Sequence, residues 1–472
     1  MFNIVSLLSE YLNVPEAATR LFLSILVGFP IAFIHRYTLY GKYPIYQHIF
    51  FITCGVSICL WNFGFNLFHS ALAIYTTYGT LKHFGGSSLA VFIIFVFNMV
   101  YLLCGYYLTS TSGYDIKWTM PQCVLTLRLI GIAFDMLDGQ KPEETLSLQQ
   151  KRVALKNHPT FLEIAAFSYF PASFIVGPQF NMKRYLDFLQ GQYTSISTDG
   201  NFIVQEIEIR DSIIPGIFQM FLGIIYVILH QLGTWYLPHE YILSMEFQQQ
   251  PFLKRIFIIG LWGHVNLYKY VCCWLLTDGV CTIFGLSYNG KDEKGRSLWN
   301  GCTNINVLKF ETATKFKHYI VAFNISTNNW CAEYIYKRLK VFGSVTCSQI
   351  LTLLFLAVWH GFHSGYYFCF FLEFIIMYAE RDLTKILKKQ EKLQKLLENR
   401  LELRILVWIF LRLHTLALMG YCLVCFTFLS YPVYFQVYSS LYHYGLLVYL
   451  IYSLISISIK FFFFKKHLKQ LE

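Results

Sequence analysis

The sequence predicts an all-α, polytopic membrane protein of about eleven spanning helices, folded as a single membrane domain over residues 1–472. Hydrophobic residues make up 56% of the chain and charged residues only 14%, whereas soluble domains carry about 25% charged residues. The apolar residues form long runs, and about 20 consecutive apolar residues cross a bilayer. Because these runs are continuous rather than alternating, they argue against a membrane β-barrel.

Eleven apolar segments recur along the chain, and several are short enough to be broken or re-entrant. They fall near residues 20–35, 45–62, 66–81, 88–109, 120–137, 161–176, 212–236, 252–286, 346–379, 404–430 and 439–464. Polar residues interrupt the early segments, among them Asn62, His69, Arg128 and Asp135. Such residues line cavities or join helices through hydrogen bonds, and joining helices is the more common role.

The net charge of +11 would suggest a nucleic-acid partner in a soluble protein. In a membrane protein the same excess is typical of cytoplasmic loops and of contact with anionic membrane lipids, so no nucleic-acid partner is expected. The 13 cysteines are scattered, mostly within apolar runs, and predict no disulfide framework. The first residues lack a basic stretch, so no cleaved signal peptide is expected.

Basic residues near the C-terminus predict the orientation in the membrane. Residues 380–404 carry eight Lys or Arg against five Asp or Glu, with leucines at near-helical spacing. This pattern predicts a basic amphipathic helix on the cytoplasmic membrane surface, with a short solvated coiled coil as the alternative. Lys465, Lys466 and Lys469 also favour the cytoplasm. An odd number of spans would then place the N-terminus in the lumen.

Residues 348–380 form an apolar run that contains His360, His363 and Glu373. Ionisable groups at membrane depth are costly and mark functional sites. In a continuous helix, His360 and His363 would share one face. No third ligand accompanies them, so no metal site is expected. On these residues alone, a packing role for His360 and a catalytic one stay equally open.

Two polar stretches add candidates. Asn324-Ile325-Ser326 is the only N-x-S/T sequence in the chain and could be a glycosylation site. The amides of Asn324 and Asn328 follow an apolar run, however, and also suit a hydrogen-bonding wall of a site. The segment Tyr268-Lys269-Tyr270 could hold a phosphorylated ligand together with Lys291, Lys294, Arg296, Lys337 and Arg338, although such charges are usually ordinary membrane anchors.

An ordered set of motifs resembles the membrane-bound O-acyltransferase family, in its lysophosphatidylcholine acyltransferase branch. The strongest are LAVWHGFHSGYY (356–367) and FNISTNNW (323–330), which place His360 36 positions after Asn324. The further matches are YDIKWTMPQCVLTLRLIG (114–131), FSYFPASFIVGPQF (167–180), LYKYVCCWLLTDGVC (267–281) and GLSYNGKDEKGRSLWN (285–300). The last block departs from the family pattern, which usually reads Trp-Asp where this chain has Trp299-Asn300.

The resemblance implies a multi-helix fold in the endoplasmic reticulum membrane, with a substrate tunnel that acyl-CoA enters from the cytosol and a lysophospholipid from the bilayer. It implies that His360 and Asn324 are the catalytic pair and that no metal or redox cofactor is needed. The residues expected to contact substrate are Trp359, Asn328, His363, Tyr268 and Lys269.

The expected reaction moves an acyl chain from acyl-CoA to the sn-2 hydroxyl of a lysophospholipid. An imidazole, with an ordinary pKa near 6.5, can take the hydroxyl proton as attack begins. The amide of Asn324 could stabilise the oxyanion or orient the alcohol. Acylation of a peptide by a member of the same family, and transport by a polytopic carrier, are the alternatives. No paired, Gly- or Pro-broken segments in two related halves support the carrier.

Overall fold

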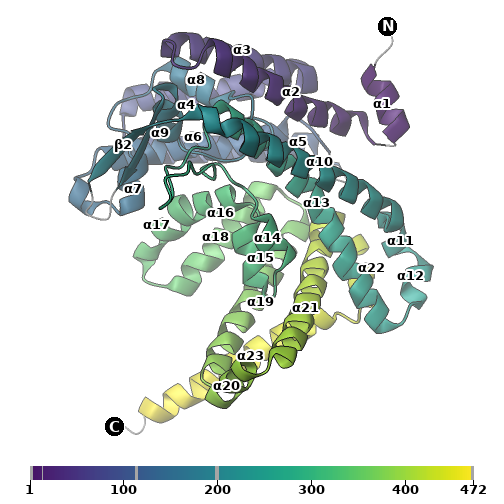
Figure 1. The fold of residues 1–472 in the computed structure, drawn as a ribbon. Coiled ribbons are helices and arrows are strands. Elements are labelled where there is room, and N and C mark those ends of the chain that lie inside the picture. Colours follow the sequence, from purple (N-terminus) through teal and green to yellow (C-terminus); the bar gives the residue numbers. More distant parts are fainter. Residues whose placement is uncertain (1–3, 13, 112–114, 197–200, 469–472) are drawn as a thin grey trace.

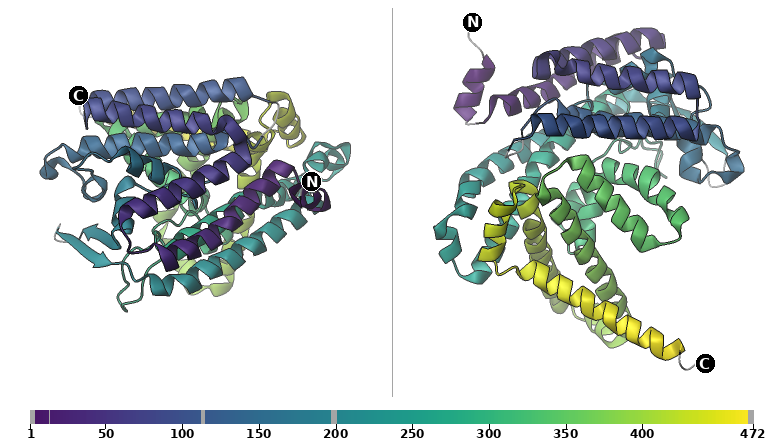
Figure 2. Two further views of the ribbon diagram at one scale, coloured as in Figure 1. Left: turned by 90° about the horizontal axis from the view of Figure 1, so that it is seen from above. Right: turned by 180° about the vertical axis from the view of Figure 1, so that it is seen from behind.

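The computed structural model describes residues 4–12, 14–111, 115–196 and 201–468 (Figure 1). The N-terminal helices form one side of the molecule. They are α1 (Ile4–Leu12), α2 (Glu16–Thr38), α3 (Pro44–Phe63), α4 (Leu67–Phe84), α5 (Ser88–Thr109) and α6 (Thr119–Gly139), with the 3-10 turn η1 (Gly64–Asn66) between α3 and α4. Figure 2 shows α2 to α5 as long rods in a layer, with the C-terminal half on its other side. Helix α6 is largely buried, because it lies between this layer and the rest of the protein.

A region of short elements follows α6, and its helices α8 (Phe161–Ser168) and α9 (Met182–Leu189) contribute to the main hydrophobic core. Its other helical elements are η2 (Glu143–Thr145), α7 (Leu148–Val153) and η3 (Ile209–Ser212). The strands β1 (Gln192–Ile196) and β2 (Phe202–Glu206) pair antiparallel, with Gln192 opposite Glu206. The hairpin projects from one end of the molecule in Figure 1. It is the only paired-strand element in the described ranges, so the all-α prediction is confirmed for the membrane part.

The long helix α13 (Phe252–Phe284) is the central support of the fold. It is preceded by α10 (Ile213–Tyr236), α11 (His239–Leu243) and α12 (Met245–Gln249). A side chain at Gly223 or Gly233 of α10 would collide with Leu276 or Val265 of α13. Small residues at these contacts let the two helices approach closely, which is how helices associate in membranes.

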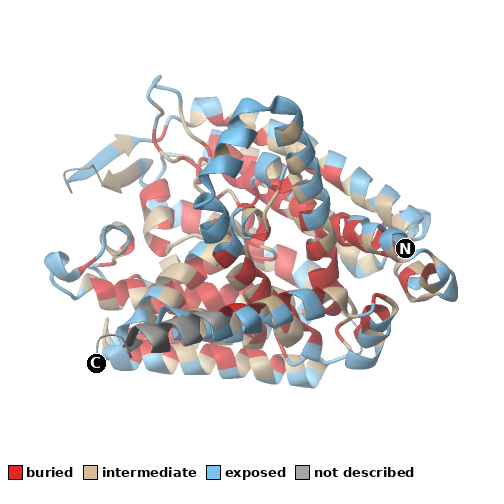
Figure 3. Cartoon of the chain, turned by 90° about the horizontal axis from the view of Figure 1, so that it is seen from below, coloured by how far each residue is buried: buried red, intermediate tan, exposed pale blue. Residues whose placement is uncertain are grey.

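The C-terminal half consists of short helices followed by long ones. The short elements are α14 (Val307–Glu311), α15 (Phe316–Ala322), α16 (Ile325–Cys331), the π-helical turn η4 (Ala332–Tyr336), α17 (Lys337–Leu339) and η5 (Lys340–Phe342). The longer ones are α18 (Val345–His360), α19 (Ser364–Lys388), α20 (Glu391–Asn399), α21 (Leu401–Phe428), α22 (Tyr431–Ser440) and α23 (Tyr444–Leu468). Buried residues run through the interior, and exposed ones cover the periphery (Figure 3).

Seven helical segments are long and apolar enough to cross a membrane, or eight if the bent pair α22 and α23 counts as one span. This supports a multi-pass membrane protein but gives fewer spans than the eleven expected. The predicted segments 45–62 and 66–81 form one helical segment through η1, and 161–176 yields only the eight-residue α8. Turns therefore interrupt or join apolar runs that hydropathy treats as separate spans.

The predicted amphipathic helix at 380–404 is divided among three elements, which corrects the expectation of one surface helix. Helix α19 continues to Lys388, α20 is a separate exposed helix, and α21 begins at Leu401. Glu380 accepts hydrogen bonds from the backbone N–H groups of Phe316 and Lys317, so it caps α15 rather than facing solvent. The side chains of Lys465 and Lys466, and all of Lys469, lie outside the described residues.

Candidate functional site

His360 is the last residue of α18, and the chain turns sharply after it. Gly361 has φ 121° and ψ −161°, a backbone conformation that is essentially restricted to glycine. A new helix, α19, begins at Ser364 after His363. The expectation that His360 and His363 share one helical face is therefore wrong, because Gly361 breaks the helix between them.

The imidazole of His360 lies in an aromatic enclosure. Its ring centroid is 5.2 Å from Tyr366, 5.7 Å from Phe370 and 5.3 Å from Phe426. In the part of the chain that the structure describes, neither ring nitrogen has a hydrogen-bonding partner. A half-buried imidazole of this kind is available to a substrate, whereas the packing histidine His35 is hydrogen-bonded to Gln47 at 2.8 Å.

Trp359 anchors the end of α18. Its indole N–H donates to the carbonyl oxygen of Cys123 at 3.0 Å, and its own carbonyl accepts from the hydroxyl of Tyr106 at 3.2 Å. These bonds tie α18 to α6 and α5. Trp359 thereby fixes the position of His360, and its ring adds a wall beside the imidazole at 4.7 Å.

Asn324 occupies a left-handed conformation (φ 51°) between α15 and α16. The preceding residue, Phe323, forms an antiparallel bridge with Ile305. Asn304 then binds the turn, accepting from the N–H of Ser326 at 2.8 Å and contacting the Asn324 side-chain oxygen through its own amide at 3.5 Å. The side-chain NH2 of Asn324 has no acceptor among the described residues, so it remains free to donate.

The other predicted contact residues take different positions. Asn328 donates both amide hydrogens to the carbonyls of Ile320 and Phe323, so it supports the Asn324 turn. His363 directly precedes α19 and its ring lies 6.1 Å from Tyr366. Tyr268 packs edge-to-face on His264 at 5.1 Å. Lys269 lies with its ammonium 5.0 Å from the centre of the Tyr270 ring.

Aromatic side chains lie next to both catalytic candidates. Phe323, which directly precedes Asn324, packs edge-to-face on Tyr270 at 6.1 Å. Phe426 contacts the ring of His360 at 5.3 Å. Phe323, Tyr270 and Phe426 all pack against one buried hydrophobic cluster. The catalytic pairing of His360 and Asn324 stays a prediction.

A cavity of about 340 Å³ lies between α6, α9, β1 and the α16–α17 segment. Ile325 and Ser326, the two residues after Asn324, form part of its wall. Its charged lining residues are Arg128, Asp135, Asp138, Arg152, Lys183, Arg184, Asp187, Glu333 and Arg338. The cavity thus joins the Asn324 turn to a strongly polar, partly basic end of the molecule.

A comparison with protein families matches residues 103–423 to MBOAT, the membrane-bound O-acyltransferase family. The chain belongs to this family. It is therefore an O-acyltransferase, and the match spans both His360 and Asn324.

Similar proteins carry the name lysophospholipid acyltransferase 5. The one from Drosophila melanogaster is 41% identical over 442 residues, covering 92% of this chain and 85% of the relative. The human one is 41% identical over 438 residues, covering 93% and 88%. The one from Caenorhabditis elegans is 32% identical over 449 residues, covering 95% and 93%.

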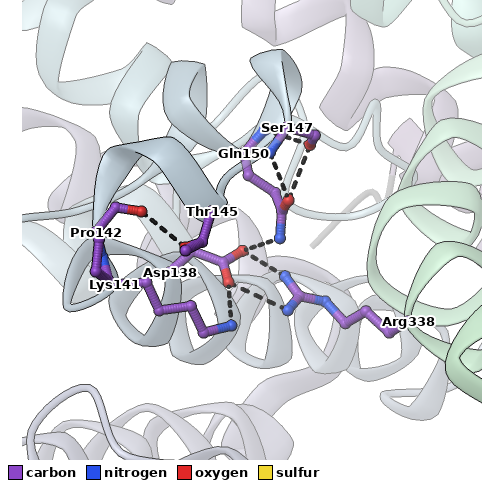
Figure 4. A network of polar contacts seen from close by, with 7 residues as sticks. All are labelled: Asp138, Lys141, Pro142, Thr145, Ser147, Gln150 and Arg338. Carbon is purple, nitrogen blue, oxygen red and sulfur yellow. Dashed lines mark hydrogen bonds and ion pairs between the residues drawn. The ribbon is translucent and has the colours of Figure 1, made fainter.

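At the polar end of the cavity, this acyltransferase contains a network centred on Asp138 (Figure 4). The fully buried carboxylate of Asp138 accepts from Arg338 at 2.6 Å, from Lys141 at 3.0 Å and from Gln150 at 3.1 Å. One turn earlier, Asp135 accepts from the hydroxyl of Tyr334 at 2.7 Å. Through these bonds the end of α6 holds the segment that begins at Asn324.

The basic residues of the cavity differ in the hydrogen-bonding partners that the protein provides for them. Arg128 donates to the carbonyls of Ser173 and Pro178 at 2.9 and 3.1 Å, so it holds the chain after α8. Arg184 donates to the carbonyls of Leu286 and Tyr288. Among the described residues, Arg152 donates to neutral oxygens, those of the Tyr193 hydroxyl and the Asn289 side chain, and pairs with no carboxylate. Arg152 therefore keeps its charge uncompensated at the cavity.

Asn300, where the family usually has a carboxylate, lines the same cavity. Its side-chain oxygen accepts from the Asn289 amide at 2.8 Å, and the Asn289 oxygen accepts from Arg184 at 3.3 Å. A carboxylate at position 300 would lie close to these guanidinium groups. The neutral amide therefore leaves this end of the cavity more basic.

Arg338 is among the basic residues that the sequence predicts could hold a phosphorylated ligand, whereas Arg152 and Lys183 were not predicted; all three line this cavity. They come from three separate polar segments, and only the folded chain brings them together. The signal that could have pointed to the cavity was Asp135, since a carboxylate within an apolar segment indicates a polar interior.

Proposed function

We propose that this acyltransferase moves a fatty acyl chain from acyl-CoA to the free sn-2 hydroxyl of a lysophospholipid, with lysophosphatidylcholine as the acceptor. The observation that carries the proposal is that the imidazole of His360 and the amide NH2 of Asn324 have no hydrogen-bonding partner among the described residues, and that each lies next to an aromatic side chain packed against one hydrophobic cluster. The names of the similar proteins support the acceptor class. Residues 1–472 act as one membrane domain in this proposal.

His360 acts as the general base. A nitrogen of its ring takes the hydroxyl proton while the alkoxide oxygen forms a bond to the thioester carbon. The tetrahedral intermediate then collapses, the carbon–sulfur bond breaks, and the imidazolium returns its proton to the departing thiolate of coenzyme A. The imidazole is neutral again at the end of each turnover, so the proposed reaction needs no cofactor besides its two substrates.

Asn324 serves the oxyanion. The turn held by Asn304 and Asn328 leaves its NH2 group without an acceptor, and a preorganised donor of this kind stabilises developing negative charge. The aromatic side chains of Tyr366, Phe370 and Phe426 exclude water from the thioester, which limits hydrolysis.

Helix α6 gives the direction in which acyl-CoA would bind. Its Cys123 carbonyl meets Trp359 beside His360, and its Asp138, in the last turn of the helix, belongs to the polar network that lines the cavity. Fifteen residues at 1.5 Å separate these points, about 22 Å, which suits an extended pantetheine arm. The phosphates of coenzyme A would then meet Arg152 and also Lys183, whose ammonium is paired with the Asp187 carboxylate. The thioester would reach His360.

This direction suits acyl-CoA that enters from the cytosol, with the C-terminus on the same side and the lysophospholipid supplied by the bilayer. The endoplasmic reticulum is the proposed membrane.

The test is transfer from radiolabelled acyl-CoA by the purified full-length protein, with a panel of lysophospholipids, simple alcohols and acceptor peptides. We expect product with lysophospholipids, and a loss of roughly 10²–10⁴-fold in kcat for His360→Ala, the usual contribution of a positioned base. Asn324→Ala should lose on the order of 10²–10³-fold. His363→Ala, measured at equal expression, is the matched control and should lose less. Full activity in His360→Ala would refute the site, and transfer to peptides alone would refute the acceptor class.

A further inference from the structure

Arg128, Arg412 and Lys269 lie near the middle of long helices. The first two have hydrogen-bonding or ion-pair partners within the protein. Arg128 of α6 donates to Ser173 and Pro178. Arg412 of α21 donates to the Tyr319 hydroxyl at 2.7 Å and lies 3.9 Å from the Glu311 carboxylate. Both guanidinium groups thus have structural partners that offset the cost of their burial.

Lys269 is the third residue and differs from the other two. It lies 17 residues after Phe252 and 15 before Phe284 in α13, so about 25 Å and 22 Å of helix separate it from the two ends. Within the described ranges its ammonium contacts the Tyr270 ring at 5.0 Å and pairs with no carboxylate. An unpaired charge at such depth is expensive and marks a functional position.

Lys269 also borders the acyl-transfer site. The Tyr270 ring beneath its ammonium packs edge-to-face on Phe323 at 6.1 Å, and Phe323 directly precedes Asn324. A cation is therefore held next to the residue that precedes Asn324.

We propose that Lys269 binds the phosphodiester of the lysophospholipid while the sn-2 hydroxyl lies at His360. This inference rests on the proposed function. In the acceptor, only the glycerol carbons C2 and C3 and one ester oxygen separate the reacting hydroxyl from the phosphorus. An anion must therefore enter the site whenever the hydroxyl does, and a charge-assisted contact to an ammonium offsets its desolvation.

Coenzyme A is the other source of phosphate. Its phosphates lie beyond the pantetheine arm, and the far end of the cavity has its own basic residues in Arg152 and Lys183. An ammonium beside Phe323 is thus placed for the acceptor rather than for the donor.

The experiment compares the wild type, Lys269→Met and Lys269→Arg as purified full-length proteins. In Lys269→Met, KM for lysophosphatidylcholine should rise roughly 10- to 100-fold, the usual effect of losing a hydrogen bond to a charged group. KM for acyl-CoA should stay within about twofold, and Lys269→Arg should recover most of the loss because it keeps the charge. The control is Lys82→Met, since Lys82 likewise lies over a tyrosine ring, that of Tyr78 at 5.9 Å, near the end of α4.

A second measurement needs no turnover. Lysophosphatidylcholine should raise the melting temperature of the wild type and of Lys82→Met more than that of Lys269→Met, and monoacylglycerol of the same chain length should not distinguish the three. If Lys269→Met does not fold, Lys269→Gln takes its place in both assays.

An unchanged KM for lysophosphatidylcholine in an active Lys269→Met protein would overturn the inference and leave the proposed function standing. A rise in KM for acyl-CoA alone would assign the ammonium to coenzyme A instead. A wild type that acylates no lysophospholipid would refute the proposed function itself. If lysophosphatidylcholine also raised the melting temperature of all variants equally, the phosphate site would be refuted too.

Discussion

Replacing Gly361 with alanine should disable the acyltransferase with little loss of folded protein. Gly361 has φ 121° and ψ −161°, and a non-glycine residue in this region costs of order 1–3 kcal/mol. A Cβ there would also contact the Tyr106 ring at 3.4 Å. The N–H of Gly361 already donates to the carbonyls of Ala357 and Val358. Alanine, the best helix former, therefore relieves the strain by extending α18 through position 361.

Such an extension would leave His360 in α18 but redirect α19, which carries Tyr366 and Phe370, away from the imidazole. We take the free-energy cost of losing the reactive geometry to be of the same size as the relieved strain, about 1–3 kcal/mol. The rate constant kcat should then fall roughly 5- to 150-fold. The assay is acyl transfer at saturating substrates, normalised to folded protein by size-exclusion chromatography. Gly343→Ala is the matched control, since Gly343 (φ 77°) precedes the same helix and an added Cβ meets nothing within 4 Å. Equal kcat values for the two variants would refute the argument that Gly361 sets the position of α19 relative to His360.

Three further predictions follow from the site and its orientation. Asn324 should be unglycosylated because its side chain belongs to a folded turn, so an N-glycosidase should leave gel mobility unchanged; a shift abolished by Asn324→Gln would contradict its catalytic role. An epitope inserted near Gln390, beside the exposed helix α20, should be accessible after selective permeabilisation of the plasma membrane, and access only after internal membranes open would invert the orientation. Cys369→Ala should keep its activity because transfer from acyl-CoA is direct, whereas a hydroxylamine-labile acyl group that this variant lacks would establish an acyl-enzyme.

Cys369 is the thiol nearest to His360 in sequence and the one that could offer a covalent route. A continuous helix would place Cys369 about 13 Å along the axis from His360 at 1.5 Å per residue. Gly361 breaks that helix, so this spacing does not apply. Instead, Tyr366 and Phe370 of α19 face the imidazole, and the buried Cys369 belongs to a different cluster with Cys422 and Cys425.

The sequence by itself determined the class of the protein and its two principal site candidates. Apolar composition predicts membrane helices because the free energy of transfer into lipid depends mainly on residue type and run length. The motif around His360 and the amides around Asn324 were likewise visible as local patterns. Hydropathy overestimated the number of spans, since it does not register the turns within 161–176 or the joining of α3 and α4.

Only the tertiary structure shows which polar groups already have hydrogen-bonding or ion-pair partners within the protein. Asn328 was expected from the sequence to contact substrate, yet its amide is occupied by the carbonyls of Ile320 and Phe323. Arg128 and Lys269 both interrupt apolar runs, but only Lys269 lacks an oxygen partner in the described part of the chain. The physical reason is that hydrogen bonds and ion pairs depend on partners far away in sequence, whereas membrane insertion depends on neighbours along the chain.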